Sequence, residues 1–86
     1  MKVLNQNLLH EENKKLRRLQ LMIDLTIQTL YQSEQITLGE GLQYIRGARN
    51  YALHLFPEKG EAFDLIYKPR LIRALKERGV FSQSRN

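Results

Sequence analysis

The segment Leu16–Tyr31 is the stretch of this 86-residue chain that is densest in apolar residues, and it constrains the fold most. A leucine or isoleucine recurs at every seventh position along it and just before it, at Leu9, Leu16, Ile23 and Leu30. This spacing places the side chains on one side of an α-helix and so predicts a continuous apolar stripe. We therefore expect a central helix from about Leu8 to Gln32, with the stripe packed against the rest of the chain.

A capping-box motif, Thr37 followed three residues later by Glu40, predicts the start of a second helix. Apolar residues follow it at helical spacing: Leu38, Leu42, Ile45, Ala48, Ala52 and Leu55. This helix should end by Phe56, because the residue before a proline disfavours helical backbone angles. Gly47 lies near its middle, where a missing side chain would let another backbone approach closely.

The C-terminal part of the chain has a shorter apolar pattern that is interrupted by Pro69. In a continuous α-helix the proline ring would clash with the carbonyl of Leu65. The pattern therefore predicts a break near Tyr67–Lys68 and a restart with Pro69 at the first helical position. A single kinked helix is the alternative. The last helix should turn one side inward, formed by Leu71, Ile72 and Leu75.

The expected fold is all-α: one domain of residues 1–86, with a long antiparallel helix pair and a short broken C-terminal helical segment across it. Gly79 is expected to end the last helix in a Schellman motif, with Val80 packing back on Leu75. Residues 1–6 and 81–86 carry no periodic pattern, so we expect them to be disordered.

The composition excludes several classes of protein. The chain has no cysteine, which excludes a disulfide framework and a thiolate metal site. No apolar run approaches the roughly 20 residues that span a bilayer. The N-terminal residues lack the apolar core of a signal peptide. We expect a cytoplasmic protein that makes no membrane contact.

Residues that commonly carry catalysis are sparse. His10 and His54 are the only histidines, and no glycine-rich phosphate loop is present. Asp24 stands among apolar neighbours, where a charge is costly unless it is solvated or paired. We expect Asp24 to point outward or to pair with an arginine such as Arg46 or Arg49, and a place in a polar pocket between helices is the alternative. We expect no catalytic residue, no metal ligand and no bound cofactor, and so a protein that is not an enzyme.

Positive charge gathers at the C-terminal end. The net charge is +5, and residues 67–86 hold six basic residues and one acidic residue. Three of these basic residues, Arg70, Arg73 and Lys76, fall on the side of the last helix opposite its apolar residues. A solvated helix face is the favoured interpretation of this basic patch. A patch that binds the phosphates of nucleic acid is the alternative.

Leu21, Leu25 and Gln28 lie off the apolar stripe of the first helix. That helix should span roughly 37 Å and the second roughly 28 Å, so one antiparallel partner cannot cover all of it. If the C-terminal segment leaves Leu21 and Leu25 exposed, pairing two copies around a two-fold axis would bury them. We expect a small interaction protein that forms a homodimer. A compact monomer is the alternative.

Overall fold

The computed structural model describes the backbone of residues 2–78 and the side chains of residues 8–78. Its elements, in chain order, are α1 (Lys2–Gln32), α2 (Leu38–Leu55), α3 (Gly60–Ala62), the π-helix η1 (Phe63–Tyr67) and α4 (Lys68–Glu77). Residues 2–78 contain no strand. The expected all-α class is confirmed.

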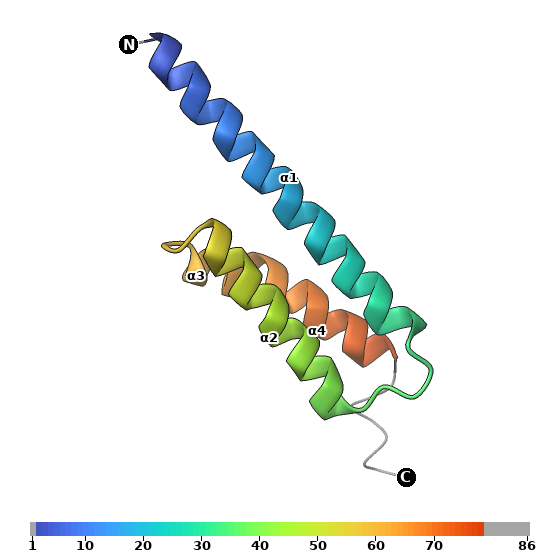
Figure 1. Ribbon diagram of the computed structural model, residues 1–86. Coiled ribbons are helices and arrows are strands. Elements are labelled where there is room, and N and C mark those ends of the chain that lie inside the picture. Colours follow the sequence, from blue (N-terminus) through green and yellow to red (C-terminus); the bar gives the residue numbers. More distant parts are fainter. Residues whose placement is uncertain (1, 79–86) are drawn as a thin grey trace.

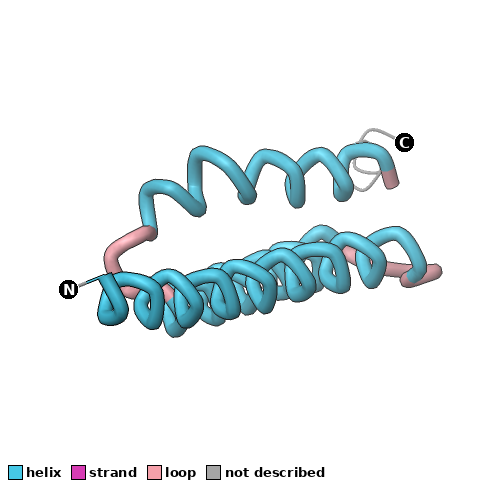
Figure 2. The backbone as a smooth tube through the Cα atoms, turned by 90° about the horizontal axis from the view of Figure 1, so that it is seen from above, coloured by secondary structure: helices cyan, strands magenta, loops and turns pink. Residues whose placement is uncertain are grey.

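The helices form two layers. α1 and α2 lie side by side and antiparallel, as the sequence predicted, and α4 packs against both. Figure 2 shows α3, η1 and α4 as one continuous helical rod on one side of the α1–α2 layer. α4 runs in the same direction as α1, and the N-terminal half of α1 extends beyond the end of α2 (Figure 1).

α1 begins at Lys2 and not near Leu8, so it is longer at its N-terminal end than the periodic pattern predicted. Residues 2–7 contain neither glycine nor proline, and the helix continues through them at little cost. With 31 residues, α1 is about 46 Å long, against about 27 Å for the 18 residues of α2. The predicted Schellman ending at Gly79 and the segment 81–86 lie outside the described residues.

The apolar stripe of α1 is buried along only part of its length. Ile23 and Leu30 have no exposed surface, whereas Leu9 and Leu16 are 58% and 44% exposed. The N-terminal half of the stripe is less covered because α1 extends beyond the end of α2, in line with the expectation that one antiparallel partner cannot cover the whole of the first helix (Figure 1). The core consists of these buried residues: Leu19, Ile23, Leu30, Ile36, Ile45, Ala48, Ala52, Leu55, Phe63, Leu71, Ala74 and Leu75.

The start of α2 has both halves of the predicted capping box. The Glu40 backbone N–H donates to Thr37 Oγ1 at 3.1 Å, and the Thr37 backbone N–H donates to Glu40 Oε1 at 3.1 Å. Two amides at the helix N-terminus thereby gain acceptors. α2 ends at Leu55, with Phe56 as its cap, as predicted from the proline that follows.

The glycine that allows helices to approach closely is Gly41, and the expectation for Gly47 is wrong. Gly41 is buried, and a Cβ built on it would lie 2.9 Å from Leu75 Cδ1 and closer still to Cδ2. A Cβ on Gly47 would meet no atom within 4 Å. α2 is therefore rotated so that Gly41 faces α4 and Gly47 faces solvent.

Pro69 does not break the C-terminal segment. The π-helix η1 precedes it, and the Lys68 N–H donates to the carbonyl of Phe63, five residues back. A wider turn of this kind makes room for a proline ring that would collide with the Leu65 carbonyl in a regular α-helix. The change of helix type falls at Tyr67–Lys68, where the break was predicted, but the helical path is continuous.

Candidate functional site

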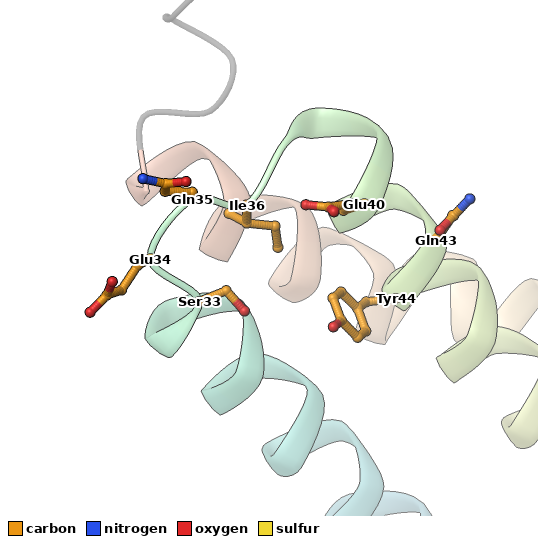
Figure 3. Close-up of a pocket in the computed structure, with 7 residues that line it drawn as sticks. All are labelled: Ser33, Glu34, Gln35, Ile36, Glu40, Gln43 and Tyr44. Carbon is orange, nitrogen blue, oxygen red and sulfur yellow. The ribbon is translucent and has the colours of Figure 1, made fainter.

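A hollow of about 680 Å³ lies at the turn between α1 and α2. Figure 3 shows the side chains that line it, with Glu34 and Gln43 pointing away from the others. Glu40 already accepts the Thr37 amide, so its carboxylate is occupied in the capping box. The polar side chains that line this hollow therefore do not all converge on one point (Figure 3).

Metal-binding geometry is absent from the described part of the chain. No group of three or more histidine, aspartate or glutamate side chains there could hold an ion. His10 and His54 are both exposed, on α1 and α2 respectively.

A bidentate ion pair joins α2 to η1. Arg49 Nε donates to Asp64 Oδ1 at 2.8 Å, and Arg49 Nη2 donates to Asp64 Oδ2 at 3.0 Å. The hydrogen bonds from Arg49 are the main cause that lowers the pKa of the Asp64 carboxyl. Burial opposes them, and the positive charges of Arg49 and Lys68 make smaller contributions that also lower this pKa. Arg49 therefore connects α2 to η1 through Asp64, and it does not pair with Asp24 as the sequence suggested.

The C-terminal ends of α1 and α4 are tied together by two polar contacts. The Tyr31 hydroxyl donates to Glu77 Oε1, and Arg78 Nη2 donates to the carbonyl of Ser33. The hydrogen bond to Glu77 is the main cause that raises the pKa of Tyr31, and burial and the negative charge of Glu77 add to it. Because α1 ends at Gln32, Arg78 satisfies a carbonyl just beyond a helix terminus.

The predicted basic patch lies on α4, and all three of its residues, Arg70, Arg73 and Lys76, are exposed. Arg70 Nη2 lies 3.9 Å from Asp24 Oδ1 on α1, at the long end of ion-pair distance. Asp24 thus points outward, as one interpretation of the sequence held, but its neighbour is Arg70 and neither Arg46 nor Arg49.

The predicted self-association residues Leu21, Leu25 and Gln28 are all exposed on α1. Leu21 is 60% exposed and Leu25 is 54% exposed, so the C-terminal segment does not cover them. Their helical positions are opposite the buried Ile23 and Leu30, and their neighbours on that side are polar, including Lys14, Arg18 and Gln32.

A second apolar surface, which the sequence analysis did not single out, lies where α1 passes the end of α2. We term it the open apolar surface and define it by four exposed residues: Leu8, Leu9 and Leu16 of α1 and Ile66 of η1. Next to Leu16 and Ile66 lies a cavity of about 250 Å³, whose other lining residues include Phe56, Phe63 and Tyr67. This surface continues the buried stripe of α1, so it has the composition of a helix interface without a partner within the described chain.

The length difference between the two helices is the signal that could have located this surface. Antiparallel helices joined by a short turn are level at the turn, so the longer one extends at its other end. α2 therefore reaches back only to about residue 15 of α1. The lining of a groove that joins Leu8 and Lys15 to Leu55 and Phe56 agrees with this position.

Comparison with protein-family models, with curated proteins and with solved structures gives no match for this chain. Within residues 2–78, the helices fall short of the combination of length and apolarity that crossing a bilayer requires. We therefore infer the candidate functional site from the exposed residues and hollows of residues 8–78.

Proposed function

We propose that this chain is a small, non-enzymatic protein-interaction module that associates with a second copy of itself. The observation that supports the proposal is the uncovered N-terminal half of the α1 stripe, where Leu8, Leu9 and Leu16 are exposed. Soluble monomers rarely leave a contiguous apolar surface without a partner. A homodimer is the simplest assembly that buries it, because two-fold pairs are the commonest homo-oligomers.

Sedimentation equilibrium across the micromolar range tests this proposal. The expected result is a mass that rises with concentration from the monomer value of 10.2 kDa toward twice that value. A mass that stays at the monomer value throughout would refute self-association. Treatment with nuclease before the run controls for association through bound nucleic acid.

Nucleic-acid binding is the second candidate function, and the exposure of Arg70, Arg73 and Lys76 along one helix supports it. If the basic patch binds phosphates, its affinity for an oligonucleotide must fall steeply with salt as counterions are released. We expect loose, salt-sensitive binding without sequence preference. Replacing all three residues by glutamine should abolish it and leave the far-ultraviolet circular dichroism unchanged. Tight, sequence-selective binding at physiological salt would place this function first.

A further inference from the structure

The shape of the open apolar surface suits an amphipathic helix. The surface extends along α1 from Leu8 to Leu16, and at its Leu16 end the cavity beside Leu16 and Ile66 has room for an additional apolar side chain. A helix of the same length, with leucines at the same spacing, is present in the chain itself. The N-terminal half of α1 in a second copy has both properties.

The charges flanking this surface distinguish between two orientations of such a copy. Among the charged residues of α1, three line the hollows beside Leu8 and Leu16: Glu11 and Glu12 come first along the helix, and Lys15 follows them. All three side chains are exposed. A parallel copy would set acid beside acid and base beside base. An antiparallel copy that crosses near Asn13 sets Glu11 of each copy beside Lys15 of the other, because both positions lie two residues from the crossing.

The same crossing point also aligns the apolar residues. With Asn13 at the two-fold axis, Leu9 of each copy lies close to Leu16 of the other, since the two positions are about equally far from the crossing. Leu16 lines the cavity, so the Leu9 side chain of the second copy reaches the mouth of that cavity. Charge pattern, leucine spacing and cavity position all favour one arrangement.

We infer that two copies of this chain pair through the N-terminal halves of their α1 helices, antiparallel and crossing near Asn13, with Leu9 of each copy seated beside Leu16 and Ile66 of the other. This inference rests on the proposed self-association and adds the surface and the orientation. It assigns no part of the contact to Leu21, Leu25 or Gln28.

A distance measurement between two spin labels tests the orientation. The chain has no cysteine, so Gln32→Cys provides a single labelling site at the exposed far end of α1. With a crossing near Asn13, the two labels are separated by about 57 Å along the helix axes, from 38 residues at 1.5 Å each. Pulsed electron-electron double resonance should give a distribution centred near that value.

Other outcomes overturn the inference in distinguishable ways. A two-fold axis near Ile23, through Leu21 and Leu25, would bring the labels to about 27 Å, and a parallel pair would bring them to within about 20 Å. Either result refutes the arrangement but leaves self-association standing. The absence of any dipolar coupling, together with a monomeric mass in sedimentation, refutes both the antiparallel arrangement and self-association itself.

Charge reversal gives an independent test. Glu11→Lys alone, or Lys15→Glu alone, should raise the dimer dissociation constant about tenfold or more at low salt, because attractive pairs between the copies become repulsive. The double variant Glu11→Lys with Lys15→Glu should restore most of the wild-type affinity. In a parallel pair each residue would face its own counterpart, and reversal would leave the dissociation constant unchanged. That result, or a failure of the double variant to recover, would contradict the antiparallel arrangement.

Discussion

Gly41 of α2 packs directly against Leu75 of α4, and no side chain larger than hydrogen fits between them. A Cβ at position 41 would lie 2.9 Å from Leu75 Cδ1, and Leu75 has no exposed surface into which it could move. The contact fixes how closely the rod that contains α4 approaches α2. The distance between the two layers of the molecule therefore depends on a glycine.

Substituting this glycine by alanine should destabilise the fold. Gly41→Ala improves helix propensity but overpacks the core, and overpacking typically costs about 1–3 kcal/mol. Gly47→Ala is the matched control on the same helix, because open space surrounds that position. It should stabilise the protein by about 0.5–1 kcal/mol. Urea denaturation of the two variants measures both effects, and a stabilised Gly41→Ala variant would show that α4 does not pack as described.

The capping box at the start of α2 should contribute to stability through a local interaction. Thr37→Ala removes the acceptor of the Glu40 amide and should cost about 1 kcal/mol of unfolding free energy. Thr37→Ser keeps an acceptor oxygen and should cost much less. A denaturation midpoint that is the same for wild type and Thr37→Ala would mean that the threonine hydroxyl does not cap this helix.

The ion pair between Arg49 and Asp64 should make stability depend on pH in the acidic range. The folded-state pKa of Asp64 lies below its ordinary value of 3.8, so the unfolded chain binds a proton more readily than the folded one. The stabilisation is thus fully present above about pH 5 and is lost as the pH falls through the folded pKa. Because both side chains are more than a third exposed, the effect is small and decreases with salt.

Asp64→Asn should remove this contribution to the pH dependence. Urea midpoints of wild type and variant should therefore differ at neutral pH and converge as the solution is acidified. A constant difference between the two proteins over the whole acidic range would indicate that the Asp64 carboxylate is not stabilised by Arg49 in the folded state.

Features that depend on neighbouring residues in the sequence could be predicted before the structure. The capping box of Thr37 and Glu40, the end of α2 before Pro57 and the disturbance of the helix ahead of Pro69 are all of this kind. Each follows from the hydrogen bonds and the steric limits of a few consecutive residues. The all-α class follows from apolar spacing over longer stretches.

Features that depend on how one helix is rotated against another were predicted less well. The apolar spacing of α2 placed Leu42 on the inner side, yet Leu42 is exposed and Gly41 next to it is buried. Which side of α2 is buried depends on its contact with Leu75 of α4, and Leu75 lies 34 residues after Gly41 in the chain. Likewise, nothing in the α1 stripe itself shows that its N-terminal half is uncovered, because this depends on where α2 ends.

The most direct test of the account compares two matched double substitutions on α1 by sedimentation equilibrium. Leu9→Lys with Leu16→Lys places two charges in the open apolar surface, and Leu21→Lys with Leu25→Lys places two charges on the opposite side of the same helix. Far-ultraviolet circular dichroism confirms first that both variants remain helical. The account predicts that the first variant sediments as a 10.2 kDa monomer and that the second remains dimeric. A dimeric first variant, or a second variant that alone becomes monomeric, would contradict it.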